Sequence, residues 1–220
     1  MLCQVCRLGL CEYGEAYRLQ KELSRKRLAG ELPDTLLLLE HPPTITIGKS
    51  GKLENILVSS EDLGSRGISL FFTDRGGDVT YHGPGQLMVY PVIDLRQRDR
   101  DIHAYVRDLE EVIMATLARF SILGQRNPRH PGVWVDGAQI AAIGIAVRKW
   151  ITMHGIAVNV SPDLTHFGLI NPCGLAGVPV TSISELTGQQ VSLQTAAETV
   201  LAEFARVFGV VTAESVPTGA

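Results

Sequence analysis

The chain has 220 residues and a mass of 23.9 kDa; 45% of the residues are hydrophobic, and 20 Lys and Arg against 23 Asp and Glu leave a net charge of −3. This composition excludes an intrinsically disordered chain, and the charge balance excludes the basic footprint of a nucleic-acid-binding domain. Four cysteines are too few for a disulfide scaffold, and no apolar run is long enough to span a membrane.

The length fits one domain, and neither a repeat nor a low-complexity linker divides the chain. We therefore expect residues 1–220 to form a single domain, with about 213–220 as a frayed tail. The first residues lack the basic region and the long apolar stretch of a signal peptide. This predicts a cytoplasmic protein with reduced thiols.

In chain order, the hydrophobic pattern first predicts an amphipathic helix over Glu12–Ala29 and then a strand over Thr35–Glu40 that is apolar on both faces. The later elements expected are strands at Thr44–Ile47 and Ile68–Thr73, a helix over Asp101–Phe120, strands at Val133–Val135, Ile140–Val147 and Ile151–Val160, and a helix over Leu193–Phe208. Hairpin-like spacing combined with long helices predicts an α/β (α+β) domain with a mixed sheet packed by helices.

Three segments concentrate residues suited to chemistry, and the first runs from Arg75 to Tyr90 (Arg-Gly-Gly-Asp-Val-Thr-Tyr-His-Gly-Pro-Gly-Gln-Leu-Met-Val-Tyr). Two adjacent glycines let the backbone approach a ligand, and an arginine beside them supplies a planar donor group. A tight hairpin would account for the glycines, but it does not require the Arg, His and Gln as well. The Gly-Lys-Ser/Thr ending of a nucleotide-binding P-loop is absent.

The second segment alternates small and branched residues along a predicted strand, and the next strand repeats the pattern. The small residues are Ala141, Ala142, Gly144 and Ala146 on the first strand and Gly155 and Ala157 on the second. Small side chains leave room either for a closely packed helix or for an apolar ligand such as an acyl chain. The pattern favours neither alternative.

The third segment holds Cys173 between a proline and a glycine, in a predicted loop. Because a loop thiol is more accessible than one in a buried element, Cys173 is a candidate nucleophile. Structural roles are expected for the other thiols, and no metal site is expected. These thiols are Cys3, Cys6 and Cys11, while His41, His103, His130 and His166 are interpreted as ordinary polar residues.

Taken together, these motifs resemble the lipoyl(octanoyl) transferase family. The resemblance covers roughly Glu40–Glu185 and rests on the Arg75–Gln86 run, on Pro131-Gly-Val-Trp134, on Ile140-Ala-Ala-Ile-Gly144, on His154-Gly155, on Asn171-Pro-Cys173-Gly and on Val180-Thr-Ser182. It implies a fold like that of biotin and lipoate protein ligases. It also implies an enzyme of lipoate biosynthesis that needs no cofactor and moves an octanoyl group from acyl carrier protein to a lysine of a lipoyl domain.

The resemblance further implies a mechanism and a set of site residues. Cys173 would attack the octanoyl thioester to form an acyl-enzyme, which the lysine amine then attacks. Backbone N–H groups of the Gly76-Gly77 turn and of the Cys173 loop are candidate oxyanion donors. The residues implied to bind substrate are Arg75, Gly76, Gly77, Asp78, Val79, Thr80, Tyr81, His82, Ala142, Ile143, Gly144, Gly155, Ile156 and Ala157.

One position departs from the family pattern: Gln139 stands where the family has a lysine that depresses the pKa of the thiol. A glutamine can hydrogen-bond but carries no charge and cannot act as a base. Three explanations stay open, namely a deliberate substitution that slows turnover, a natural variant in which His82 or His154 handles the proton, and a chain that binds acyl groups without transferring them efficiently. Our hypothesis is that binding survives and transfer is slowed.

Two other functions compete with acyl transfer. One is an ATP-dependent lipoate or biotin protein ligase, which would leave Cys173 unexplained, and the other is a non-catalytic protein that binds acyl groups or lipoyl domains. The expected partners are octanoyl-loaded acyl carrier protein and the lipoyl domains of 2-oxoacid dehydrogenases and of the glycine cleavage H protein, with no nucleic acid and no membrane. Candidate basic rims that would steer acidic partners are Arg18, Lys21, Arg25, Lys26 and Arg27, or Arg96, Arg98 and Arg100, although a solvated helix face or loop is the better explanation of each run.

Overall fold

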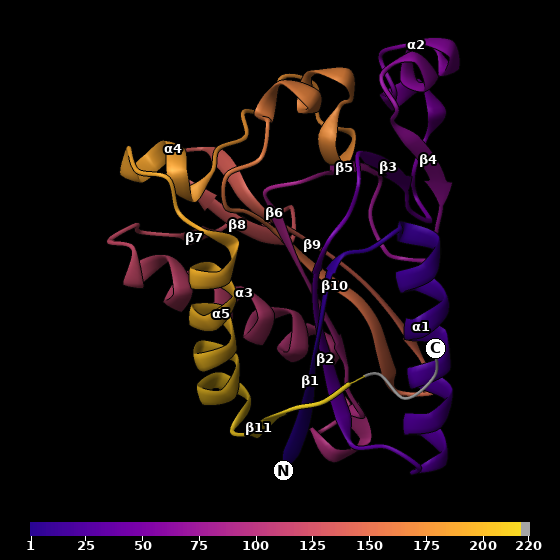
Figure 1. The fold of residues 1–220 in the computed structure, drawn as a ribbon, viewed down its shortest axis with the longest axis vertical. Coiled ribbons are helices and arrows are strands. Elements are labelled where there is room, and N and C mark those ends of the chain that lie inside the picture. Colours follow the sequence, from indigo (N-terminus) through magenta and orange to yellow (C-terminus); the bar gives the residue numbers. More distant parts are fainter. Residues whose placement is uncertain (217–220) are drawn as a thin grey trace.

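The computed structural model describes residues 1–216, except for the side chain of Cys173. An eight-stranded mixed sheet runs through the molecule (Figure 1). Its strands, in spatial order, are β11 (Val211–Glu214), β1 (Leu2–Leu10), β2 (Asp34–Glu40), β6 (Gln86–Val92), β10 (Ile151–Asn159), β9 (Ala138–Arg148), β8 (Gly132–Val135) and β7 (Gln125–Arg126).

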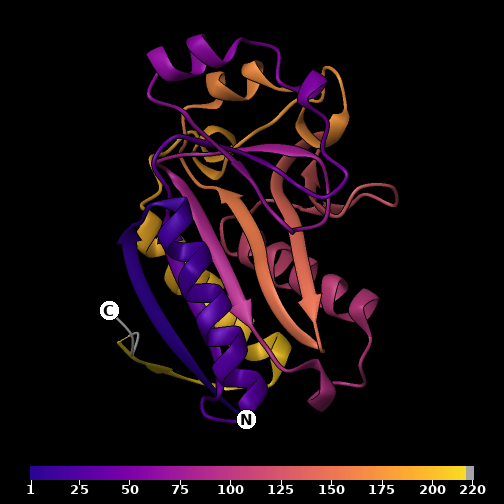
Figure 2. The ribbon, with the colours of Figure 1, turned by 90° about the vertical axis from the view of Figure 1, so that its right-hand side faces the viewer.

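Helices cover both faces of this sheet. The helix α1 (Tyr13–Ala29) lies on one face, and α3 (Ile102–Arg119) and α5 (Leu193–Phe208) lie on the other (Figure 2). Each face therefore has its own apolar core, with Leu37 and Met88 beneath α1 and Leu36 and Val89 beneath α3 and α5. The continuous apolar run of β2 is explained by this burial on both faces.

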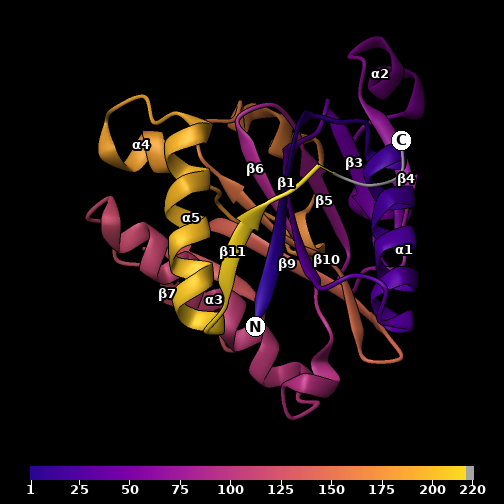
Figure 3. The same cartoon turned by 60° about the horizontal axis from the view of Figure 1, so that its bottom comes forward.

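The edges of the sheet depend on parallel pairing. Strands β1 and β2 are parallel because α1 crosses between them, and β11 adds parallel to β1 with Leu2 opposite Val211 (Figure 3). The left-handed Gly30, at φ 78°, ends α1 before the chain turns into β2. From β2 to β7 the neighbouring strands are antiparallel.

A second sheet of three strands sits at one end of the large sheet (Figure 2). Its strands are β4 (Ser69–Phe72), β3 (Thr44–Ile47) and β5 (Val79–His82), in that spatial order. The short helices of the chain are η1 (Leu53–Asn55), α2 (Ser60–Ser65), η2 (Leu95–Gln97), η3 (Leu164–Leu169), η4 (Pro172–Gly174) and α4 (Ile183–Thr187). Residues of η3 share an apolar cluster with β3 and β5.

The mixed sheet packed by helices confirms the predicted fold class, and the long helices begin and end within a residue of their predicted bounds. The predicted frayed tail is wrong at its start, because Ala213 and Glu214 pair with β1 and Glu214 accepts a hydrogen bond from Arg7 at 3.0 Å. The rest of that prediction, residues 217–220, lies outside the described part of the chain. Within that part, no helix is long and apolar enough to cross a membrane.

Candidate active site

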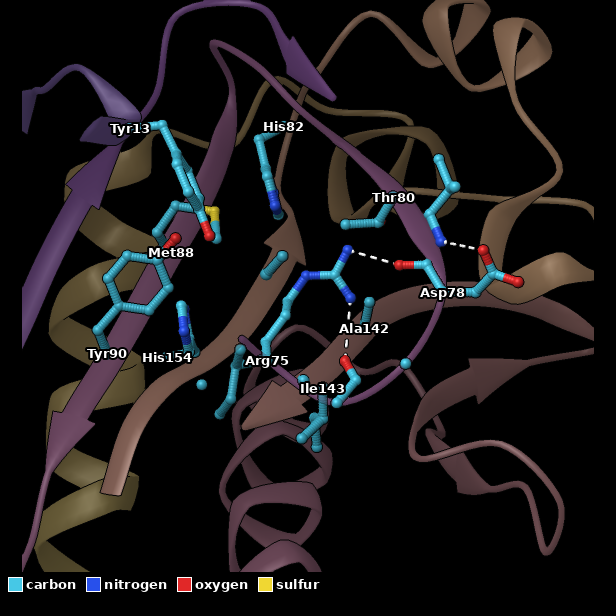
Figure 4. Close-up of a pocket in the computed structure, with 17 residues that line it drawn as sticks. Tyr13, Arg75, Asp78, Thr80, His82, Met88, Tyr90, Ala142, Ile143 and His154 are labelled. Carbon is cyan, nitrogen blue, oxygen red and sulfur yellow. Dashed lines mark hydrogen bonds between the residues drawn. The ribbon is translucent and has the colours of Figure 1, made fainter. Parts of the chain in front are cut away.

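A pocket opens where the second sheet meets strands β9 and β10 of the large one, and Figure 4 shows its lining. It holds about 470 Å³ of empty space, its open mouth included. Two of the three segments singled out from the sequence line it. The first supplies Arg75–Thr80, His82, Met88 and Tyr90, the second supplies Ala142–Gly144 and His154–Ala157, and Tyr13 joins them from α1.

The small residues of β9 and β10 make this space because they pair in register. Gly144 lies opposite Gly155 and Ala142 opposite Ala157 across the antiparallel pair. A side-chain carbon at Gly155 would lie 2.2 Å from the carbonyl oxygen of Val89, so this position requires glycine. The alternation serves two purposes at once, since Ala141 packs in the core under α3 and α5 while Ala142 lines the pocket. Both explanations of the small residues therefore hold, one on each face of β9: close helix packing on the face toward α3 and α5, and space for a ligand on the other face.

Arg75 organises the turn above these strands. Its Nη2 donates to the carbonyl oxygens of Thr46 and Asp78, both at 2.8 Å, and its Nη1 donates to that of Gly76 at 3.0 Å. The side chain is 8% exposed, and Figure 4 shows it crossing the middle of the pocket. A planar group with several donors suits this task, and a lysine in its place would lose the fork geometry.

Asp78 connects this turn to the loop that carries Cys173. Its carboxylate accepts from the backbone N–H of Lys52 and from the Asn55 amide, at 3.0 and 2.8 Å. The carbonyl oxygen of Asn55 in turn accepts from the N–H of Asn171 at 2.8 Å, just before η4. A side-chain carbon at Gly174 would lie 2.7 Å from Asp78 Oδ2, so the loop passes directly against this carboxylate. The backbone of Cys173 is thus held next to the Gly76–Asp78 turn, while its side chain lies outside the described part of the structure.

Gln139 is tied to the returning end of the same loop. Its backbone N–H donates to Pro179 O at 2.9 Å, and its carbonyl accepts from Thr181 N–H at 3.0 Å. The side chain is 4% exposed, and its Nε2 has no hydrogen-bond partner among the described residues. A buried amide nitrogen without an acceptor costs roughly 1–3 kcal/mol, and no residue of the described part supplies an acceptor to Gln139.

Buried histidines and tyrosines form the wall of the pocket that lies toward α1. His82 Nδ1 donates to Gln86 Oε1 at 2.8 Å, its Nε2 accepts from the Thr46 hydroxyl at 3.2 Å, and Tyr13 stacks on its ring at 6.0 Å between centroids. His154 Nε2 lies 2.8 Å from Asp74 Oδ1. Burial lowers the pKa of both imidazoles below their ordinary value, and the hydrogen bond from His154 holds the pKa of Asp74 well below its usual range. Both histidines are therefore neutral near pH 7.

His41, which the sequence did not single out, lies behind this wall, in ring contact with Tyr13, His82 and Tyr90. Its Nδ1 lies 2.6 Å from Cys11 O and its Nε2 lies 2.9 Å from the Tyr90 hydroxyl. Because a carbonyl oxygen only accepts, Nδ1 carries the proton and Nε2 accepts from Tyr90. Burial lowers the pKa of His41 to about 4.

This arrangement predicts a loss of stability in mild acid. We expect the free energy of unfolding to be constant above about pH 6.5 and to fall toward pH 4, because unfolded His41 binds a proton in this window and folded His41 does not. A pKa lowered from 6.5 to about 4 corresponds to about 3 kcal/mol at pH 4. His82 and His154 shift in the same direction. Urea denaturation from pH 8 to 4 measures the loss.

The matched variants are His41→Gln and His103→Gln, the latter on the exposed side of α3. His41→Gln is expected to lose less stability than the native chain between pH 6.5 and 4, and His103→Gln to lose as much as the native chain. Equal losses of unfolding free energy in the native chain and in His41→Gln would contradict the lowered pKa of His41 as the cause.

Three details differ from what the sequence suggested. The N–H of Gly76 donates to Ile145 O at 2.8 Å, so it is not available to an oxyanion. Tyr81 points away from the pocket, with its hydroxyl 2.8 Å from His166 Nδ1. Of the basic runs, Arg27 is buried against Asp34, with 2.7 Å between Nε and Oδ1. Arg96 likewise pairs with Asp94, and Arg98 donates to Phe208 O.

Three pocket residues were not predicted from the sequence: Tyr13 lies outside the segments singled out, and Met88 and Tyr90 lie at the end of the first segment but were given no role. Each belongs to a helix or strand whose apolar pattern is explained by core packing alone. No local signal distinguishes these three from their buried neighbours, because the pocket reaches them only through the order of the strands.

Comparisons with known proteins agree with this geometry. The model of the lipoyl protein ligase A/B catalytic domain family matches residues 12–205. An octanoyltransferase of Caldicellulosiruptor saccharolyticus is 50% identical over 95% of this chain and 90% of its own length. Among solved structures, the putative lipoate protein ligase Ta0514 of T. acidophilum with bound lipoic acid superposes with a TM-score of 0.80 at 17% identity, over 99% of this chain and 90% of that one. The Aquifex aeolicus biotin protein ligase, at 13% identity over 94% of this chain and 70% of that one, gives a TM-score of 0.54.

The two solved structures confirm the predicted ligase-like fold. The chain belongs to the lipoyl protein ligase A/B catalytic domain family. Within that family its close relatives are octanoyltransferases, so the chain is an enzyme of octanoyl transfer.

Proposed function

We propose that this enzyme takes an octanoyl group from the thioester of acyl carrier protein and passes it to a lysine of a lipoyl domain, through a thioester on Cys173. The observation that carries the proposal is the placement of the Cys173 loop against Asp78, at the mouth of a pocket lined by small and apolar residues. The name of its relatives supports the octanoyl group as cargo.

The two steps balance without a cofactor. The Cys173 thiolate attacks the octanoyl carbonyl, the new carbon–sulfur bond replaces the carrier's, and the carrier leaves as a thiol after taking up a proton. The neutral amine of the acceptor lysine then attacks the second thioester, which forms the amide and returns the thiol of Cys173. The acyl tail lies against the paired segments Ala142–Gly144 and Gly155–Ala157 in both steps, so the carbonyl stays at the mouth.

The mouth has room for both protein substrates in turn. A second groove of about 850 Å³, open to solvent, shares the Gly76–Asp78 turn and Ile143-Gly144 with the acyl pocket. Its other wall includes Val106 and Pro131. An acyl chain in the pocket therefore leaves its reactive end beside an open surface that a carrier arm or a lysine side chain reaches.

The test separates the two steps by intact mass. The enzyme is incubated with octanoyl-acyl carrier protein, weighed, and then mixed with an unmodified lipoyl domain. We expect the enzyme to gain one octanoyl group and to lose it as the domain gains one. Octanoylation of the domain only when free octanoate and ATP are supplied would overturn the proposal in favour of a ligase.

A further inference from the structure

The pocket has a closed end opposite its mouth, and four side chains make it. These are Tyr13 of α1, Met88 and Tyr90 of β6 and His154 of β10, each less than 5% exposed. In Figure 4 they lie across Arg75 from Asp78, with Met88 between Tyr13 and Tyr90. An acyl chain whose carbonyl is at the Asp78 side would point its terminal methyl at this group.

Hydrogen bonds hold three of the four side chains in place. The Tyr13 hydroxyl donates to Thr73 Oγ1 at 3.2 Å, the Tyr90 hydroxyl lies 2.9 Å from His41 Nε2, and His154 is paired with Asp74. Moving any of them would break a buried polar contact. Met88 is the exception, because a thioether forms no strong hydrogen bond and its side chain has three rotatable bonds.

The backbone of Met88 is fixed even though its side chain is adaptable. It lies in the middle of the sheet, opposite Leu39 of β2 on one side and Ala157 of β10 on the other. Its side chain shares the apolar cluster beneath α1 with Cys6, Ala16 and Leu23. Behind it are packed side chains, so a chain that reaches Met88 meets a filled core.

We propose that Met88 limits the length of the acyl chain that this enzyme accepts. The inference rests on the proposed function and adds its specificity: the ligand is an unbranched saturated acyl group, and its terminal methyl contacts the Met88 side chain. Shortening that side chain opens space for further methylene groups, and a bulkier one fills the space that the last methylenes of an octanoyl group need.

The experiment offers the enzyme an equimolar mixture of hexanoyl, octanoyl, decanoyl and dodecanoyl thioesters of acyl carrier protein and weighs the acyl-enzymes. In Met88→Ala we expect the ratio of decanoyl- and dodecanoyl-enzyme to octanoyl-enzyme to rise by about tenfold or more, since one methylene in a tight apolar pocket changes specificity by roughly 10–200-fold. In Met88→Phe, which leaves no cavity, we expect hexanoyl-enzyme to replace octanoyl-enzyme as the main product.

The matched control is Met153→Ala. Met153 is equally buried, at 4% exposed, but it lies on β10 against a separate groove lined by Lys21 and Arg25. Its chain-length profile is expected to stay native. Native profiles in both Met88 variants, or the same shift in Met153→Ala, would overturn the inference while leaving the proposed function intact. If the native chain takes up no acyl group of any length, the proposed function fails and the inference falls with it.

Discussion

Replacing Cys173 by alanine is expected to abolish the octanoyl-enzyme and to lower octanoyl transfer to a lipoyl domain by at least about 10³-fold. The reason is that the proposed route divides one acyl transfer into two steps through this thiol, and no other nucleophile takes its place. Binding of the acyl chain depends on β9 and β10 and is expected to survive. Intact mass after incubation with octanoyl-acyl carrier protein measures the first effect, and the rate of domain octanoylation measures the second.

Cys11 provides the control for this experiment, because it is a partly exposed thiol in the same chain. Burial raises the pKa of the Cys11 thiol, and its Sγ lies 3.6 Å from Glu12 O, which leaves it unsuited to nucleophilic attack. We expect Cys11→Ala to form the octanoyl-enzyme at the native rate. A mass gain of one octanoyl group in Cys173→Ala would rule out the proposed thioester.

Replacing Gln139 by lysine is expected to raise the rate of octanoyl-enzyme formation at pH 7 by about 10- to 100-fold. A cation near a thiol favours the thiolate and lowers its pKa, whereas the glutamine amide leaves the charge of the site unchanged. The position is suited to this role because its backbone is hydrogen-bonded to Pro179 and Thr181 at the end of the Cys173 loop. The amide nitrogen that lysine would replace has no partner among the described residues.

The pH dependence of single-turnover acylation tests this explanation directly. In the native chain the rate is expected to rise with pH as the thiol ionises, and in Gln139→Lys the rise is expected to move to lower pH. Ala138→Lys adds the same charge one residue earlier on β9 and is expected to leave the profile in place. Identical profiles for the native chain and Gln139→Lys would show that the proton is handled elsewhere, with the neutral His82 and His154 as the remaining bases in the pocket.

Much of the fold followed from local patterns. The hydrophobic pattern and the end signals of the helix α1 and of the doubly buried strand β2 each lie within about 20 consecutive residues. The local sequence is therefore enough to predict both elements. The hairpin of β9 and β10 is also local, and its small residues face each other because only two residues, Lys149 and Trp150, separate the strands. The interpretation of Cys3 and Cys6 as buried structural thiols agrees with their place on β1, where Cys3 packs in the core beneath α3 and α5 and Cys6 packs in the core beneath α1.

The fold class, the family and the segments around Arg75, Ala142 and Gly155 could be predicted without coordinates, since these carry their signal in consecutive residues. That the segments share one pocket lined also by Met88, that Asp78 contacts the Cys173 loop and that Tyr81 faces away could be learned only from the three-dimensional arrangement. These facts depend on the strand order β2-β6-β10-β9 and on hydrogen bonds between residues more than 20 positions apart, and no local pattern of hydrophobicity encodes such pairings.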